Sequence, residues 1–120
     1  VWQKAHRLAL AIYEVTKDFP RDEIYGLTSQ MRRCASSIPA NVAEGCGTSS
    51  RADFARFLQM AMSSASELEY HLLLGRDLNY LDREAYQGLN AAVIEIKRML
   101  PPFIGKLRSF GRGRSPPAED

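Results

Sequence analysis

The side chains that could bind a metal ion are few and unsuitably spaced. The chain has only two histidines, His6 and His71. A di-iron site in a helical bundle needs a Glu from each of two helices and a Glu-x-x-His pair from each of the other two. Glu67 and His71 are four residues apart rather than three, and there is no second Glu/His pair. The sequence therefore predicts no metal site and no cofactor.

The two cysteines are equally poor candidates for nucleophilic catalysis. Cys34 falls on the apolar face of a predicted helix, where a buried and inert thiol is usual. Cys46 lies between Gly45 and Gly47 with no histidine near it, and this segment lacks the spacing of a phosphate-binding loop. We therefore expect that the protein is not an enzyme. Two cysteines form no disulfide framework, which indicates a reducing, cytoplasmic location.

Three acidic side chains stand among apolar or small residues: Glu44, Glu67 and Glu69. Glu67 precedes a predicted core position, Leu68, so it should flank a helix seam and reach Arg32 or Arg33. An ion pair that fixes the register of two helices is a commoner use of such a group than acid/base catalysis. We therefore expect structural ion pairs at these positions.

Composition is that of one ordinary domain. The 120 residues include 45% apolar and 25% charged side chains, enough for one hydrophobic core. No apolar run approaches the ~20 residues needed to cross a bilayer, and the first residues do not resemble a signal peptide. We expect no membrane association.

The positive charge of the chain is weak evidence for a nucleic-acid partner. The net charge of +2 is too small to indicate a nucleic-acid-binding protein by itself. Arginine outnumbers lysine by 12 to 4, and its planar guanidinium suits phosphate, although genomic base composition can produce the same bias. The candidate phosphate contacts are Arg32, Arg33, Arg51, Arg56, Lys97, Arg98, Lys106 and Arg108. For the basic segment 105–114, a solvated tail is the competing interpretation.

Apolar residues at steps of three and four predict four helices. The first covers residues 2–19 and ends before Pro20, because proline cannot donate to a helix interior. The second covers residues 22–44, with an inner face of Leu27, Met31, Cys34, Ile38 and Val42. We expect a kink or a break at Pro39 and a left-handed stop at Gly45.

The third helix is predicted for residues 50–79, with Ser50 as its N-cap and Asn79 in a left-handed conformation at its end. The fourth is predicted for residues 82–110, with a bend or a break near Pro101-Pro102. Its predicted apolar stripe is Ala85, Leu89, Ala92, Ile96, Met99, Phe103, Leu107 and Phe110. Four such helices with short connections predict an all-α protein, an antiparallel up-down four-helix bundle over residues 1–110. Residues 111–120 are predicted to form a disordered basic and proline-containing tail.

Some apolar residues lie beside or off these narrow stripes: Leu10, Tyr13, Met60 and Leu74. They could leave apolar surface for self-association after one bundle closes, or they could widen the intramolecular face. From the residues alone, both interpretations stay open.

Short motifs in a fixed order point to a family. The motifs lie between Trp2 and Glu69, the string at residues 37–45 is specific, and the resemblance covers about Trp2 to Phe110, nearly the whole chain. In order they are Trp2-x-Lys4-Ala5, Phe19-Pro20, Glu23-x-Tyr25-Gly26-Leu27, Gln30-Met31-Arg32-Arg33, Ser37-Ile38-Pro39-Ala40-Asn41-Val42-Ala43-Glu44-Gly45, Asp53-Phe54-x-x-Phe57-Leu58 and Ser64-x-x-Glu67-Leu68-Glu69. On these motifs the chain resembles the four-helix-bundle proteins encoded by intervening sequences in bacterial large-subunit (23S) ribosomal RNA genes. It is also similar to the accessory variability determinant of diversity-generating retroelements.

The resemblance implies a four-helix protomer that assembles into a ring, usually a homopentamer. It also implies, for the retroelement members, a basic surface that binds nucleic acid and an association with a reverse transcriptase. The chain departs from the common pattern at Thr48, Met62 and Ser63, which removes positive charge from such a surface. At Asn79, where glycine is common, the exchange is harmless because both residues accept a left-handed conformation.

The leading hypothesis is a non-enzymatic, oligomeric scaffold or adaptor that binds RNA or DNA through arginines. The alternative is a pure protein-interaction module for a reverse transcriptase or another partner, without nucleic-acid contact. We expect a ring-like homo-oligomer, a homopentamer by the resemblance. Closed cyclic symmetry is expected because a head-to-tail contact that does not close builds filaments.

Overall fold

Four amphipathic segments of the chain form four α-helices in the computed structural model, which describes residues 1–109. They are α1 (Trp2–Thr16), α2 (Leu27–Cys46), α3 (Arg51–Asp77) and α4 (Arg83–Ser109), with a 3-10 turn, η1 (Arg21–Glu23), before α2. These described residues contain no β-strand. The predicted all-α class is confirmed, and the first and second helices begin or end a few residues inside their predicted limits.

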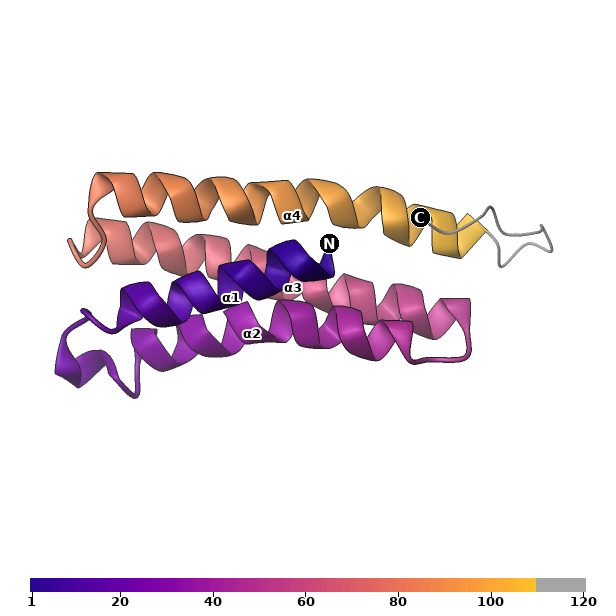
Figure 1. Cartoon of the computed structure of the whole chain (residues 1–120), viewed down its shortest axis with the longest axis horizontal. Helices are drawn as coiled ribbons and strands as arrows, with labels where there is room; N and C mark the ends of the chain where they lie inside the picture. Colours follow the sequence, from indigo (N-terminus) through magenta and orange to yellow (C-terminus); the bar gives the residue numbers. More distant parts are fainter. Residues whose placement is uncertain (110–120) are drawn as a thin grey trace.

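The helices alternate in direction and pack in cyclic order, each against two neighbours (Figure 1). The α2–α3 interface is the most extensive of the four, and the α1–α4 interface is the least extensive. This arrangement is that of an antiparallel up-down four-helix bundle. None of the helices in residues 1–109 is long and apolar enough to cross a membrane.

Three predicted features of the helix ends are confirmed: the caps at Ser50 and Asp82 and the left-handed conformation of Asn79. Ser50 Oγ accepts a hydrogen bond of 3.0 Å from the Asp53 amide at the start of α3. Asp82 Oδ1 accepts one of 2.7 Å from the Ala85 amide at the start of α4. Asn79 has a φ of 64° in the connection between these two helices, the left-handed conformation that asparagine tolerates. Each of these capping hydrogen bonds and this dihedral preference involves only residues within one helical turn.

The predicted left-handed stop at Gly45 is wrong. Gly45 is buried inside α2, which continues to Cys46, and the C-cap residue Gly47 has an ordinary φ of −88°. A Cβ atom on Gly45 would lie 2.7 Å from Cδ1 of Phe54 and 3.2 Å from Cβ of Phe57 on α3. The glycine therefore serves the close approach of two aromatic side chains.

Neither proline position ends its helix. Pro39 lies inside α2, and Pro101 and Pro102 lie inside α4, so the alternative of a break into shorter helices is wrong at both places. The predicted bends there stay predictions. Ser36, one turn before Pro39, donates to the carbonyls of Arg32 and Arg33, at 2.8 and 3.2 Å.

The core runs along the bundle axis. Of the predicted apolar stripe of α4, Ile96 and Leu107 are buried as expected, but three other members are displaced by one position. The largest side chains that are fully buried are Ile12, Met31, Ile38, Leu58, Leu68, Leu72, Val93, Ile96 and Leu100. On α4 we predicted Ala92, Met99 and Phe103, but these are partly exposed. Their neighbours Val93, Leu100 and Ile104 are buried instead. Both sets follow the same spacing, so only packing against α1 and α3 decides between them.

Because α1 is shorter than α3 and α4, one part of the bundle contains three helices rather than four. Helix α1 has 15 residues, whereas α3 and α4 have 27 each. In Figure 1, α1 lies beside only part of their length. Phe110 and the predicted tail, residues 111–120, lie outside the described residues.

Candidate functional site

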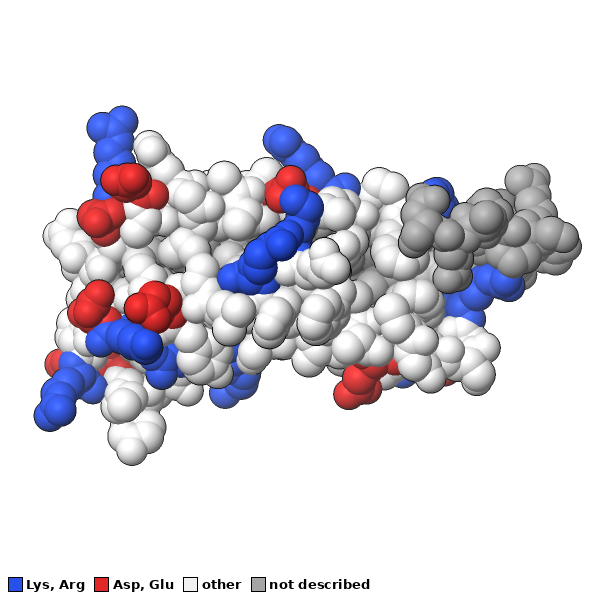
Figure 2. Space-filling view, in the orientation of Figure 1, with Lys and Arg blue, Asp and Glu red and all other residues white. Residues whose placement is uncertain are grey.

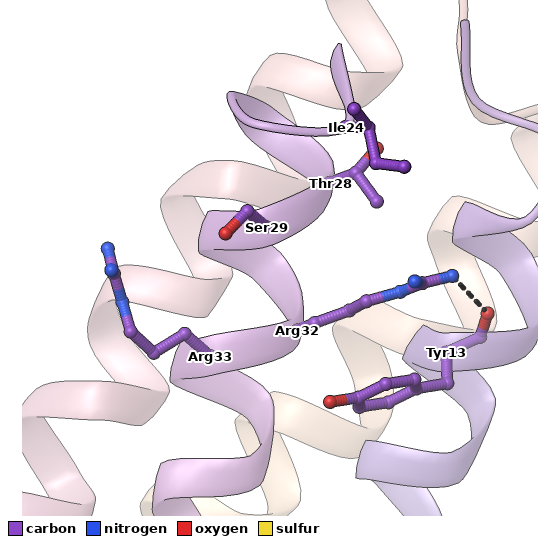
Figure 3. Close-up of a pocket in the computed structure, with 6 residues that line it drawn as sticks. All are labelled: Tyr13, Ile24, Thr28, Ser29, Arg32 and Arg33. Carbon is purple, nitrogen blue, oxygen red and sulfur yellow. Dashed lines mark hydrogen bonds between the residues drawn. The ribbon is translucent and has the colours of Figure 1, made fainter. Parts of the chain in front are cut away.

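A shallow hollow between α1 and α2 gathers polar and apolar side chains at the surface. It has a volume of about 340 Å³ and is lined by Tyr13, Ile24, Thr28, Ser29, Arg32 and Arg33. Figure 3 shows Arg32 reaching across it toward Tyr13, while Arg33 extends away from it. The hollow is open to solvent and contains one anchored cation and one freely extended cation.

Arg32 is held in place by contacts from α1. Its Nε donates to Thr16 Oγ1 at 2.9 Å, and its Nη2 donates to the Tyr13 carbonyl at 3.3 Å (Figure 3). Its guanidinium carbon lies 4.8 Å from the centre of the Tyr13 ring, a cation–π distance. Thr16 is buried and donates in turn to the Ile12 carbonyl at 2.7 Å. Because a guanidinium has five N–H donors, others remain for a ligand.

An apolar line of side chains continues from the hollow along the outer face of α1. We call it the α1 stripe: Trp2, His6, Leu10 and Tyr13, at spacings of four, four and three. Leu10 is 57% exposed, and Trp2 stacks on His6 with ring centres 5.1 Å apart. Ile24, which lines the hollow, and its neighbour Tyr25 are also exposed, Tyr25 by 93%.

The apolar residues predicted to lie off the stripes are largely at the surface. Leu10, Tyr13 and Met60 are exposed. Leu74 is partly buried and packs against the core. The first three therefore do not serve to widen the intramolecular face.

The eight candidate phosphate contacts lie in groups along the bundle. Arg32 and Arg33 are on α2. Residues 51 and 56 begin α3 and residues 106 and 108 end α4, so these four share one end of the antiparallel bundle. Residues 97 and 98 lie near the middle of α4. On the face in Figure 2, basic side chains likewise stand apart, several beside acidic ones.

Some of these cations already have protein partners. Lys97 Nζ donates to Glu69 Oε1 at 2.7 Å across the α3–α4 interface. Arg56 lies 3.6 Å from Asp53 and above the Phe57 ring. An exposed pair of this kind is worth little and can be exchanged for a phosphate.

The acidic candidates have three different environments. Glu69 pairs with Lys97, and a register role for this pair stays a prediction. Glu44 is exposed and has no side-chain partner within the part of the chain that is described. Glu67 meets His71 on its own helix at 3.1 Å, so the expected partner, Arg32 or Arg33, is wrong.

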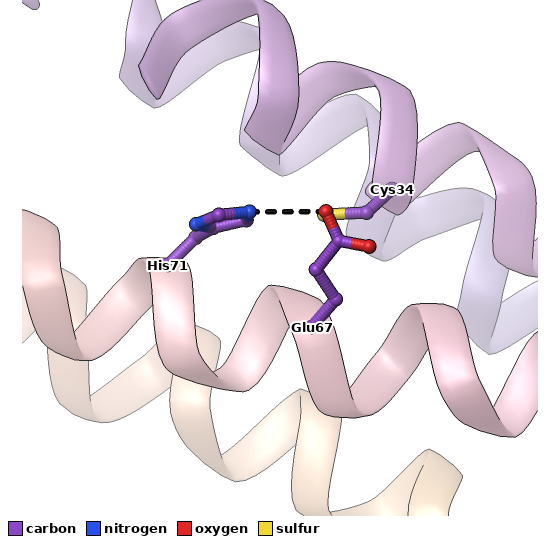
Figure 4. Close-up of side chains that lie close together, drawn as sticks. All are labelled: Cys34, Glu67 and His71. Atoms are coloured by element: carbon purple, nitrogen blue, oxygen red, sulfur yellow. Dashed lines mark hydrogen bonds and ion pairs between the residues drawn. The ribbon is translucent and has the colours of Figure 1, made fainter. Parts of the chain in front are cut away.

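Tertiary packing also brings Cys34 on α2 to Glu67 and His71 on α3 (Figure 4). One possible ligand atom from each lies within 4.8 Å of the other two. Cys34 and His71 are buried, and His71 Nδ1 has no hydrogen-bond partner among residues 1–109. Sequence analysis missed this group because it considered only the spacing of Glu67 and His71 along one helix, and the third member comes from another helix.

The Cys34 group does not have the geometry of a nucleophile with its base. In a cysteine–histidine–acid triad, the thiol and the acid face different ring nitrogens. Here Glu67 bonds Nε2 of His71, and the sulfur of Cys34 lies on the same side of the ring (Figure 4). Burial, with the charge of Glu67 as a smaller cause, raises the pKa of the Cys34 thiol to about 12. The thiol is therefore protonated at neutral pH.

Comparison with known proteins points to one family. The family model described as 23S rRNA-intervening sequence protein matches residues 1–101. A crystal structure from Bacteroides thetaiotaomicron VPI-5482, described as a protein of unknown function from the S23 ribosomal protein family, is 31% identical with a TM-score of 0.78. The match covers 86% of this chain and 96% of that chain. Among curated proteins, none matches.

Proposed function

The chain belongs to the family of 23S rRNA-intervening sequence proteins, and from this premise we propose that it is a non-enzymatic, oligomeric scaffold that binds RNA. The observation that carries the proposal is the exposed α1 stripe, which borders two arginines on α2. An apolar surface beside cations is suited to bind a second protein copy and a phosphate backbone together.

Self-association is supported by the kind of side chains in the α1 stripe. Trp2 and Tyr13 are aromatic, and such residues are enriched at protein interfaces. Leu10 is more than half exposed in the protomer, so its burial against a second copy removes apolar surface from water. The resemblance makes a pentameric ring the expected assembly.

Light scattering after size-exclusion chromatography tests the assembly. We expect a mass several times 13.5 kDa, five times for the pentamer. Leu10→Glu should shift the mass toward the monomer, because it places a charge in the contact. Ala11→Glu is the matched control, since Ala11 lies on the other flank of α1 in the groove that faces α4. A monomeric wild-type protein at micromolar concentration would refute the scaffold.

RNA binding is supported by the anchored Arg32 and the extended Arg33. Arg32 is pre-organised by Thr16 and Tyr13, so less side-chain freedom is lost when it binds an anion. A net charge of +2 per chain is small, but a ring repeats it around one axis and makes binding multivalent. The family's name makes a fragment of 23S rRNA the first probe.

Filter binding at several salt concentrations tests this part. Phosphate contacts release counterions, so affinity should fall steeply as salt rises. Arg33→Ala should weaken the affinity for all RNA sequences alike. It should also lower the slope of log affinity against log salt concentration by about one for each chain that contacts the RNA. Gln30→Ala, an exposed and uncharged position on the same helix, is the control. Negligible affinity at low salt would exclude RNA as the ligand.

A protein partner is the second candidate, and Tyr25 favours it. This tyrosine is 93% exposed beside Ile24, and exposed aromatic residues often anchor protein interfaces. A partner such as a reverse transcriptase would then co-purify with the chain and remain bound after nuclease treatment. Loss of Tyr25 through Tyr25→Ala should release it.

A further inference from the structure

A line of polar side chains runs along the α2–α3 interface. Its members recur at spacings of three and four on both helices: Cys34, Ser37 and Asn41 on α2, and Ser64, Glu67 and His71 on α3. Ser37 Oγ lies 2.8 Å from Ser64 Oγ, and Asn41 Nδ2 donates to Ser37 Oγ at 2.9 Å. These three side chains satisfy one another. Of the other three, His71 Nε2 bonds Glu67 Oε2 and Cys34 Sγ donates to the Met31 carbonyl at 3.5 Å. His71 Nδ1 is left buried without a partner among residues 1–109.

We propose that Cys34, Glu67 and His71 form a Zn²⁺ site that joins α2 to α3. Their side chains point toward one another from the two helices (Figure 4), and one possible ligand atom from each lies within 4.8 Å of the others. Zn²⁺ bonds of about 2.0–2.3 Å in tetrahedral geometry place neighbouring ligand atoms roughly 3.3–3.6 Å apart. The 3.1 Å between His71 Nε2 and Glu67 Oε2 is close to this spacing.

The donor set favours zinc over other common ions. A thiolate, an imidazole nitrogen and a carboxylate oxygen are the three ligand types that Zn²⁺ accepts. Magnesium and calcium prefer oxygen ligands alone, so a sulfur ligand disfavours them. Three protein ligands leave a fourth position, and Glu67, whose side chain is 51% exposed, gives water and the ion access from solvent.

Charge balance supports a site at this depth. Binding breaks the S–H bond of Cys34, forms an S–Zn bond and releases the proton to solvent. The thiolate and the Glu67 carboxylate together then neutralise the dication. A neutral group avoids most of the cost of burying an isolated charge.

A buried histidine at this position fits the proposal. His71 is 8% exposed within the α2–α3 interface, and within residues 1–109 only its Nε2 has a hydrogen-bond partner, Glu67. A metal bond through Nε2 gives the ring a strong interaction that an apolar side chain of similar size would lack. Nδ1 lies on the far side of the ring from Cys34 and Glu67 (Figure 4), so the ion does not bond it.

Spectroscopic titration of the full chain tests the site. The untagged protein is reduced, stripped of metals with a chelator and titrated with Co²⁺, a spectroscopic substitute for Zn²⁺. We expect thiolate-to-cobalt charge-transfer absorption that saturates at one ion per chain and disappears when one equivalent of Zn²⁺ is added. Absence of this absorption from the wild-type protein would overturn the proposal.

Variants assign the ligands. Cys34→Ser should abolish the charge-transfer absorption, whereas Cys46→Ser, the matched control at the exposed cysteine, should preserve it. The opposite result would overturn the site. Glu67→Gln is the decisive variant if Cys34→Ser does not fold, because the Glu67 side chain is half exposed. It should lower Zn²⁺ affinity at least about 10-fold. Unchanged affinity would also overturn the proposal.

Discussion

The α2–α3 and α1–α4 interfaces close the same bundle by different means. Between α2 and α3, glycine and aromatic side chains interlock at Gly45, and the polar line of Ser37 and its neighbours is partly buried. Between α1 and α4 lies a groove of about 420 Å³, bridged by the exposed ion pair of Lys4 and Glu95 at 3.1 Å. The α2–α3 interface is closely packed, whereas the α1–α4 interface joins a short helix to a long one and leaves a groove between them.

This difference indicates where the protein can interact without losing its fold. The α2–α3–α4 part holds the longer helices and the two most extensive interfaces. Helix α1 has the least extensive contact with α4, so it should open at a lower free energy than the rest. It is also the helix whose outer face carries the α1 stripe.

The largest expected effect is in thiol reactivity. Cys34, in the α2–α3 interface, should react with iodoacetamide at least about 1000-fold more slowly than Cys46, because a pKa raised from 9.0 to about 12 removes most thiolate at pH 8. Mass spectrometry of the native, metal-free protein should show a single modified cysteine, Cys46. Rapid labelling of Cys34 would mean that the α2–α3 interface opens more readily than its packing indicates.

Truncation of leucines compares the fully buried core with the α1–α4 groove. Leu68 on α3 is fully buried, so Leu68→Ala should lower the free energy of unfolding by ~2–5 kcal/mol. Leu89 on α4 is partly buried and lines the α1–α4 groove, so Leu89→Ala should cost about 1 kcal/mol. Urea denaturation measures both. Equal losses would contradict the contrast between the interfaces.

Glycine substitutions should change stability in opposite directions. Gly45→Ala places a Cβ 2.7 Å from Phe54 and should destabilise the protein by ~1–3 kcal/mol through overpacking. Gly88 lines the α1–α4 groove, and a Cβ there meets nothing within 4 Å. Gly88→Ala should therefore stabilise by about 0.5–1 kcal/mol through helix propensity. Thermal melts followed by circular dichroism give both signs, and the same sign for both would refute this account.

The smallest expected effects are those of the polar contacts. Ser37→Ala removes the hydrogen bonds to Ser64 and Asn41 in a part-buried position and should cost about 1 kcal/mol. Lys4→Ala removes only the exposed pair with Glu95 and should cost ~0–1 kcal/mol, decreasing in high salt. Chemical denaturation in low and high salt separates the two. A salt-independent loss for Lys4→Ala would point to packing by its aliphatic stem instead.

The sequence by itself determined the four helices, most of their ends and most of the core. Ser50, Asp82 and Asn79 act through hydrogen bonds and dihedral preferences within one turn, and the three-four spacing identifies most of the apolar faces. Such rules depend only on neighbours along the chain, so they can be read without knowing the fold. The buried face of α2, from Leu27 to Val42, was correctly predicted for this reason.

Tertiary structure alone decided which side chains from different helices meet. It brought Cys34 to Glu67 and His71, and it turned Gly45 from an expected stop into a contact for Phe54. These outcomes depend on the rotation and axial register of whole helices, which are set by packing against neighbours. A change of one position along a helix turns a side chain by about 100°, enough to move it from surface to core. For that reason the sequence could predict an apolar face on α4 but could not choose between its two possible sets of buried residues.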